Sequence, residues 1–258
     1  MVKLSKRLMA VASMVCQDQI LADVGTDHGY IPIYLMEQGR ITGAIAMDIG
    51  KGPLERAKEH IKMSGMGDYI QTRLSDGLAA LHVGEVQSIV VAGMGGGLVI
   101  HILEEGRKVA QAVEELILQP QSELEKVRDY LRENGYTVEA EDMVFEDGKY
   151  YPMMRVRYTG KVTEDKRITA LREQMKEQMH LDEAQIEGIF ARYGAGLLAE
   201  KNATLFAYLQ KEQHTYQVIL ENLKGQPSSA NILERQKEMQ EKMLQNEQAG
   251  SLFERNEG

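Results

Sequence analysis

Acidic residues and glycines near the N-terminus are spaced as in loops that bind a ligand. Residues 20–32 read ILADVGTDHGYIP, an apolar run that leads into a glycine-containing turn. Asp23, Gly25 and Gly29 match loops in which glycine lets the backbone pass close to a ligand. Asp27 replaces the usual middle glycine, and its carboxylate would repel a pyrophosphate but not a cationic sulfonium. The alternative is a strand-to-helix turn without a ligand.

Two further acidic positions extend this pattern. Asp48 closes the apolar run 44–48, where a carboxylate accepts hydrogen bonds from the ribose hydroxyls of an adenosine. Asp76 and Gly77 follow the run 70–74, and an aspartate in this turn commonly meets the adenine amino group of S-adenosylmethionine (SAM). A helix cap formed by Ser75 or Asp76 is the alternative. Together with the first loop, these residues predict an adenosyl ligand.

A second glycine-rich segment follows the run 88–92. Residues 91–98 read VAGMGGGL, so four of the five positions from 93 to 97 are glycine. Such a loop lets flat groups approach the backbone at the crevice of an open α/β sheet. Gly93 and Met94 are therefore candidates for the floor of a reaction site. A flexible loop without a ligand is the alternative.

The elements that must position these residues alternate between short apolar runs and amphipathic stretches. The expected strands are 20–24, 44–48, 70–74, 88–92 and 116–119, and helical patterns cover 52–63 and 123–134. This alternation predicts an α/β fold with a parallel sheet. Strand-like segments 136–145 and 150–158 flank Asp147-Gly148, which is a strong hairpin signal. Five parallel strands and a hairpin outline a Rossmann-like class I methyltransferase sheet in residues 1–160.

The remainder of the chain has no strand pattern. Residues 161–248 are rich in good helix formers, and we expect residues 161–258 to form a helical coiled-coil hairpin whose tail frays from Gln245. Glu212 is the one polar residue in an otherwise apolar heptad seam. A break at residues 225–229 separates the two arms. The apolar seam positions are Leu205, Leu209, Tyr216, Ile219, Leu223, Ile232, Met239 and Met243.

Composition limits the classes of protein. No apolar run reaches the length of a membrane span, and the N-terminal 16 residues fit an amphipathic helix better than a signal peptide. Cys16 is the single cysteine, which suits a reducing compartment, so we expect a cytoplasmic protein. We also expect no metal, since His101, Glu104 and Glu105 are placed on one exposed helix face.

The net charge of the chain limits the kinds of partner that it can bind. The net charge of −9 disfavours a generic nucleic-acid binder. A local basic patch requires five cations to converge, namely Lys3, Lys6, Arg7, Arg155 and Arg157. The sequence leaves the oligomeric state open, with a monomer as our expectation.

Four motifs resemble the bacterial tRNA (adenine-22 N1)-methyltransferase family. They are DVGTDHGYIP at 23–32, SDGL at 75–78, AGMGG at 92–96 and LILQPQ at 116–121. The resemblance implies SAM as the methyl donor and N1 of an adenine in the tRNA D-arm region as the acceptor. It places Gly25, Asp27, His28 and Gly29 at the methionine and ribose part of SAM. It also places Asp48 at the ribose, Asp76 and Gly77 at the adenine, and Gly93 and Met94 below the reacting groups. The role of Gln119-Pro120-Gln121 is open.

The chemistry of the reaction selects one catalytic candidate. Methyl transfer from a sulfonium is an in-line displacement, and adenine N1 already carries a lone pair, so alignment matters more than a base. The methylated adenine becomes cationic, and we predict that the Asp27 carboxylate stabilises this charge. N1 lies on the pairing edge, so the base must be unpaired or extruded, with Tyr30 as a stacking face. His28 is either a proton shuttle or a hydrogen-bonded residue at the helix start.

Other classes of function stay open. These are a methyltransferase acting on another RNA or a small molecule, an NAD-dependent oxidoreductase, and a catalytically silent SAM-binding or RNA-binding module. Asp27 and the hairpin at Asp147-Gly148 disfavour the oxidoreductase.

Overall fold

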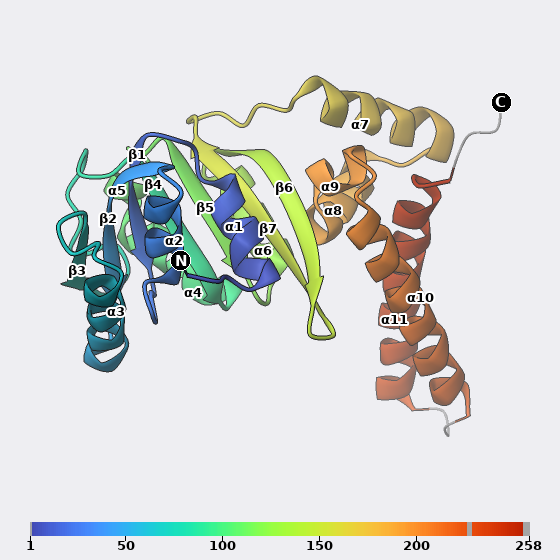
Figure 1. Cartoon of the computed structure of the whole chain (residues 1–258). Coiled ribbons are helices and arrows are strands. Elements are labelled where there is room, and N and C mark those ends of the chain that lie inside the picture. The colour runs from blue at the N-terminus through green and yellow to red at the C-terminus, as the bar shows by residue number, and fades with distance from the viewer. Residues whose placement is uncertain (1, 226–228, 255–258) are drawn as a thin grey trace. The chain divides into compact units, whose positions relative to one another are not determined.

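The computed structural model describes residues 2–225 and 229–254. The chain divides into two compact units, Met1–Asp165 and Lys166–Gly258 (Figure 1). The first holds every strand of the described chain, and the described elements of the second are all helices.

The first unit is built on one seven-stranded sheet in the order β3-β2-β1-β4-β5-β7-β6. Strands β1 to β5 are parallel, and β7 joins β5 antiparallel. The predicted α/β class and all five parallel strands are confirmed. The strands are β1 Gln19–Val24, β2 Ile41–Asp48, β3 Ile70–Leu74, β4 Ser88–Met94, β5 Glu115–Pro120, β6 Tyr136–Glu146 and β7 Lys149–Tyr158.

Helices cover both faces of the sheet and bury a separate core on each. One face packs against α1 Lys6–Met14, α2 Tyr30–Glu37 and α3 Lys51–Met63, through residues such as Val11, Ile33 and Ile61. The other packs against α4 Gly96–Glu105, α5 Arg107–Ala110 and α6 Leu124–Glu133, through residues such as Leu103 and Leu131. Because β1 to β5 run parallel, their carboxyl ends lie at one edge of the sheet, and the two cores fix the sheet between its helices.

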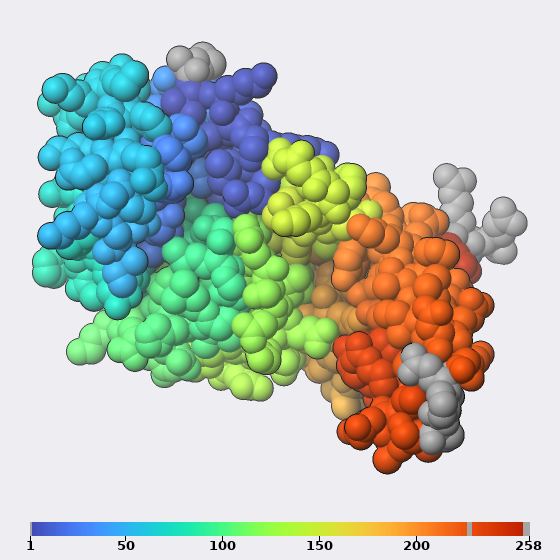
Figure 2. All heavy atoms as spheres, turned by 90° about the horizontal axis from the view of Figure 1, so that it is seen from below, coloured from blue at the N-terminus to red at the C-terminus, as the bar shows by residue number. Residues whose placement is uncertain are grey.

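The hairpin between β6 and β7 forms where the sequence predicts it. Asp147 and Gly148 both have positive φ, +48° and +78°, as a two-residue type I′ turn requires. Glu146 at the tip is tied to α1, because its carboxylate oxygens accept hydrogen bonds from the backbone N–H groups of Lys6 and Arg7 at 2.5 and 3.3 Å. Figure 2 shows the dark-blue N-terminal residues beside the yellow-green hairpin.

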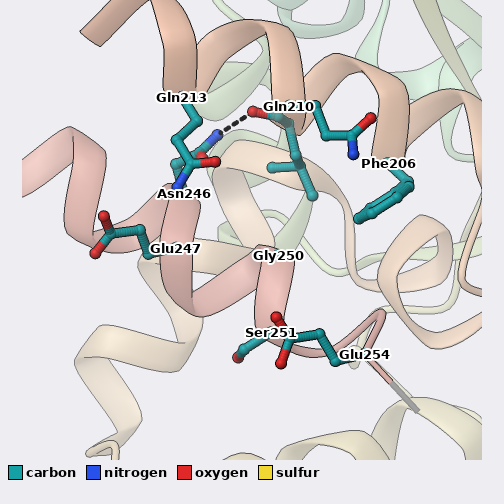
Figure 3. A pocket seen from close by; sticks show the side chains of 9 residues that line it. Phe206, Gln210, Gln213, Asn246, Glu247, Gly250, Ser251 and Glu254 are labelled. Atoms are coloured by element: carbon teal, nitrogen blue, oxygen red, sulfur yellow. Dashed lines mark hydrogen bonds between the residues drawn. The ribbon is translucent and has the colours of Figure 1, made fainter. Parts of the chain in front are cut away.

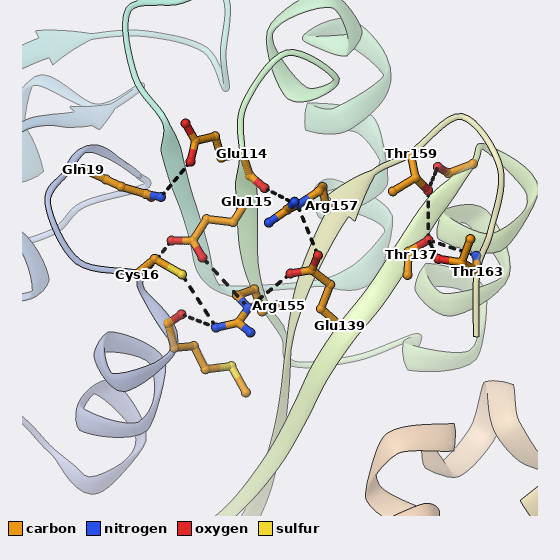
Figure 4. Close-up of polar contacts among 12 residues, drawn as sticks. Cys16, Gln19, Glu114, Glu115, Thr137, Glu139, Arg155, Arg157, Thr159 and Thr163 are labelled. Carbon is orange, nitrogen blue, oxygen red and sulfur yellow. Dashed lines mark hydrogen bonds and ion pairs between the residues drawn. The ribbon is translucent and has the colours of Figure 1, made fainter. Parts of the chain in front are cut away.

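The local basic patch that the sequence left open does not form, because β7 carries Arg155 and Arg157 to the amino ends of the parallel strands. Both pair with Glu139, at 3.5 and 3.1 Å, as Figure 4 shows. Arg155 Nη1 also donates to the carbonyl of Met14 at the far end of α1 from Arg7. The cations of α1 and β7 therefore lie at different edges of the sheet.

The helical hairpin is shorter than predicted. Only α10 Ala203–Lys224 and α11 Ala230–Ser251 pack side by side as two long helices, and residues 226–228 of the predicted break lie outside the described residues. Residues 166–199, expected in the hairpin, instead form α7 Lys166–Met179, α8 Glu183–Tyr193 and α9 Ala195–Ala199. The tail expected to fray from Gln245 is helical through Ser251, because Asn246, Ala249 and Leu252 are buried.

Glu212 is the centre of a buried polar network rather than an intruder in an apolar seam. Its carboxylate accepts hydrogen bonds from Tyr193 and Tyr208 hydroxyls at 2.7 and 2.9 Å. It also pairs with Arg192 and accepts the Asn246 amide, at 3.2 and 3.0 Å. The tyrosine pKa values are raised by burial, whereas the neighbouring Arg192 helps to hold the pKa of Glu212 below its usual value. Satisfied buried networks of this kind fix helix register.

No helix of the described ranges 2–225 and 229–254 combines the length and apolarity needed to cross a bilayer.

Candidate active site

A cavity opens at the carboxyl edge of the sheet, where the chain order reverses between β1 and β4. Ligands of open α/β sheets bind at this switch point. The cavity has a volume of about 290 Å³. Its lining includes six of the predicted site residues, Asp23, Gly25, Asp27, His28, Gly29 and Gly93, together with Arg7, Leu8, Thr26, Tyr30, Ile31 and Ala92.

Gly25 is required by the packing of the loop after β1. Its φ is +76°, and a Cβ atom there would lie 2.0 Å from Cε of Met94. Its N–H donates to the carbonyl of Met47 in β2 at 2.8 Å. Met94, predicted as a site residue, is thus absent from the cavity lining but supports the loop that forms it.

Asp23 places a buried carboxyl group at this cavity. It is 6% exposed, and burial raises its pKa to about 6, against the opposing effect of a hydrogen bond with Thr26. Negative charge on Asp48 adds to the increase. A cationic ligand group would stabilise the ionised form of such a carboxyl. The pocket therefore fits an ammonium group beside Asp23.

Asp27 lies at the exposed mouth of the cavity, with 59% of its side chain accessible. The Arg56 guanidinium of α3 pairs with its Oδ1, through Nη2 and through Nε at 3.2 Å. Its Oδ2 lies 3.2 Å from Nε2 of His28. The hydrogen bond from Arg56 is the main reason that the pKa of Asp27 lies below its usual value. The carboxylate is therefore charged and already partnered.

Three nearly parallel rings form an aromatic cluster beside this ion pair, defined as His28, Tyr30 and His60. Their centroids lie 4.9, 5.0 and 5.4 Å apart. His60 Nδ1 lies 3.2 Å from the carbonyl of His28, which ties α3 to the loop. Tyr30 is 36% exposed and lines the cavity. His28 and Tyr30 of this cluster line the cavity, whereas His60 packs against them from α3.

Asp48, Asp76 and Gly77 lie at the ends of β2 and β3, outside the cavity lining. Asp48 Oδ1 accepts the N–H of Gly50 at 2.6 Å, and its carbonyl accepts the N–H of Ser75 at 2.9 Å. Residues 77–80 form a turn rather than the capped helix that was the alternative, and Ser75 Oγ accepts the N–H of Ala80 at 3.1 Å. The side chain of Asp76 is exposed.

Sequence reasoning missed three site residues on helices. Arg56 and His60 are four positions apart on α3 and so share the face that meets the loop after β1. Arg7 on α1 lines the cavity, and its Nη1 donates to Oε1 of buried Gln119 at 2.8 Å. This bond gives Gln119 a structural role beside Gly93. The spacing on α3 was a usable signal, whereas nothing near Arg7 in the sequence indicated the cavity.

A second cavity, of about 320 Å³, lies in the helical unit between α10 and α11 (Figure 3). Its polar lining consists of amides, a hydroxyl and the carboxylates of Glu247 and Glu254, with no lysine or arginine among the lining residues. Such a lining does not suit a phosphate group. His101, Glu104 and Glu105 lie on α4, and the described residues contain no group of three or more acidic, histidine or cysteine side chains able to hold a metal ion.

Comparisons with known proteins agree with this geometry. Residues 4–154 match the family model described as a methyltransferase domain. The tRNA (adenine(22)-N(1))-methyltransferase of Bacillus subtilis (strain 168) is 34% identical over 242 residues, covering 93% of this chain and 94% of the relative. The crystal structure of the B. subtilis M1A22 tRNA methyltransferase TrmK has a TM-score of 0.79 and 30% identity, covering 97% of this chain and all of that one. Streptococcus pneumoniae Sp1610 in complex with S-adenosyl-L-methionine has a TM-score of 0.78 and 32% identity, over 96% of this chain and 100% of that chain.

Proposed function

The chain belongs to the tRNA (adenine(22)-N(1))-methyltransferase family, and we propose that it transfers the methyl group of SAM to N1 of adenine 22 in tRNA. The observation that carries this proposal is the cavity at the β1/β4 switch point. It places a buried acid, Asp23, and two glycine segments, at Gly25 and Gly93, around one space. SAM, when bound, supplies the electrophilic methyl group.

We assign the donor contacts to residues along the carboxyl edge of the sheet. Asp23 fits the methionyl ammonium, because a cation there offsets the cost of its buried charge. Asp48 would accept the ribose hydroxyls, and Asp76 with Gly77 would meet the adenine. Gly25 and Gly29 keep the loop after β1 close enough for the ligand to lie against the backbone.

The acceptor requires placement more than activation. Adenine N1 has a free lone pair, so the protein's task is to extrude the base and hold it in line with the methyl group. Tyr30 offers a half-exposed ring for stacking. Positive charge appears on the methylated base, and we propose that Asp27 stabilises it, with His28 and Arg56 fixing the carboxylate.

The helical unit is our candidate for holding the tRNA. Many of its described cations pair with acids, within one helix as for Arg235 and Lys242 with Glu238, at 2.6 and 2.7 Å, or between helices as for Arg172 with Glu187, at 2.7 Å. Binding there would consequently rest on shape and on a few phosphate contacts rather than on a broad basic face. We further propose that the enzyme acts as a monomer in the cytoplasm, which size-exclusion chromatography and cell fractionation would check.

The activity is tested by incubating the protein with radiolabelled SAM and bulk bacterial tRNA, followed by nucleoside analysis. The expected product is 1-methyladenosine. Calorimetry with SAM and with NADH on the same protein separates the reaction classes. Tighter binding of NADH than of SAM would contradict the proposal, as would SAM binding with no label in tRNA.

A further inference from the structure

The cavity lining contains two carboxylates, Asp23 and Asp27, but only one arginine or lysine, Arg7. The methionyl group of SAM carries an ammonium and a carboxylate on one carbon, next to the sulfonium. Asp23 and Asp27 suit the cationic groups. Arg7 is the single arginine or lysine in the cavity lining, so it is the one permanent cation positioned to meet the carboxylate.

The neutral side chains of Gln119 and Tyr151 hold the Arg7 guanidinium in place. Nη1 donates to Oε1 of Gln119, which is fully buried, and the guanidinium carbon lies 5.5 Å from the centre of the Tyr151 ring. The backbone N–H of Arg7 donates to Glu146 at 3.3 Å. Among the described residues, no carboxylate forms an ion pair with the guanidinium. Its charge is therefore oriented and is offset only in part, by Coulombic attraction to the Glu146 carboxylate.

The Arg7 guanidinium lies beside the strand ends that border the proposed SAM site. A Cβ atom on Gly93 would lie 3.6 Å from Arg7 Nη1, so the cation faces the end of β4. Asp23 ends β1, the neighbouring strand in the sheet. Arg7 and Asp23 thus both line one cavity of about 290 Å³.

We infer that Arg7 binds the methionyl carboxylate of SAM, an inference that rests on the proposed function. A guanidinium recognises a carboxylate through two parallel hydrogen bonds, which an ammonium cannot reproduce. Gln119 occupies Nη1 and leaves other donors of the fork for the ligand. Arg7 therefore selects donors that carry an intact amino-acid group.

The test compares SAM with decarboxylated SAM, which keeps the sulfonium and the amino group and lacks only the carboxylate. Calorimetry on full-length protein carrying Arg7→Gln should show SAM affinity reduced about tenfold or more, as expected for loss of a charge-assisted hydrogen bond. The affinity for decarboxylated SAM should change less than about twofold, because its partner is already absent. Arg7→Lys should give an intermediate loss with SAM.

Lys6→Gln is the matched control, because Lys6 is an exposed neighbour on α1 outside the cavity and its replacement should leave both affinities unchanged. Thermal unfolding without ligand checks that the variants fold. An equal loss for both donors, or an unchanged SAM affinity, would overturn the inference. A selective loss of tRNA affinity would overturn it too and would assign Arg7 to an RNA phosphate. Failure of the unsubstituted protein to bind SAM would instead remove the proposed function.

Discussion

Asp27 and Arg56 form an ion pair at the mouth of the candidate SAM site, with Nε of Arg56 3.2 Å from Oδ1 of Asp27. The pair joins the loop after β1 to α3, and more than half of the Asp27 side chain remains exposed. The carboxylate is thus fixed in place by a partner that also neutralises part of its charge.

Asp27→Asn should lower the rate of methylation at saturating SAM and tRNA while changing SAM affinity little. The amide keeps the shape and removes the charge that stabilises the cationic product. We expect the rate to fall about tenfold. This is less than the loss of about a hundredfold or more that one electrostatic contact can cause, because Arg56 and solvent screen the carboxylate. Single-turnover kinetics measures the rate, and calorimetry measures the affinity.

Glu59→Gln is the control for this prediction, since it removes a negative charge from α3, the helix that carries Arg56, at an exposed position outside the cavity. If Asp27→Asn weakens SAM binding and leaves the rate unchanged, Asp27 is a binding residue and not a catalytic one.

Asp48→Asn should weaken SAM binding by about tenfold or more. The asparagine oxygen can still accept the Gly50 N–H, which isolates the loss of charge from the loss of the turn. A charge-assisted hydrogen bond contributes ~1.5–3 kcal/mol, and the ribose hydroxyls would supply such bonds. Calorimetry with SAM gives the answer, and an unchanged affinity removes Asp48 from the site.

SAM affinity should rise with pH between 5 and 7 and then level off. The pKa of Asp23 is raised to about 6 in the folded protein, so its contribution to stability is greatest below about pH 4 and is lost as pH rises through 6. A bound ammonium reverses this preference and favours the ionised carboxylate. Affinity at pH 5 should therefore be about tenfold below that at pH 7. Asp23→Asn should abolish this dependence; a pH profile that survives the substitution would show that another group titrates.

Truncation after Asp165 should separate donor binding from RNA binding. The first unit keeps the whole cavity and the contact of the Thr163 N–H with Thr137 Oγ1 at 3.1 Å, which a shorter fragment ending at Tyr158 would lose. SAM affinity should stay within about twofold, whereas tRNA affinity should fall about tenfold or more, with a shallower salt dependence. Fluorescence titration at two salt concentrations measures the latter. Equal tRNA affinity for both proteins would exclude the helical unit from RNA binding.

Local signals were sufficient for the sheet and for much of the site. The apolar runs predicted the parallel strands, and Asp147-Gly148 predicted the hairpin because its positive φ values are a property of those two residues. Asp23, Gly25 and Gly93 converge because the carboxyl ends of parallel strands meet at one edge.

Contacts between distant segments could not be predicted in this way. Arg7 reaches Gln119 across 112 positions, and no periodicity encodes such a pairing. In the helical unit, uniform helix-forming composition concealed three short helices. The signals that mark their boundaries were present, but each is only a few residues long. Asp182 and Gln185 form the capping box that starts α8, Gly194 with positive φ lies between α8 and α9, and Asn202 caps the start of α10.

The central claim is methyl transfer to N1 of adenine 22, and two tRNA transcripts that differ only at that position test it most directly. One carries adenine at position 22 and the other guanine, and each is incubated with the protein and labelled SAM. Label incorporation and a primer-extension stop locate the methyl group. The account predicts 1-methyladenosine at position 22 of the first transcript and no label in the second. Equal labelling of both transcripts, or a methyl group at another position, would contradict it.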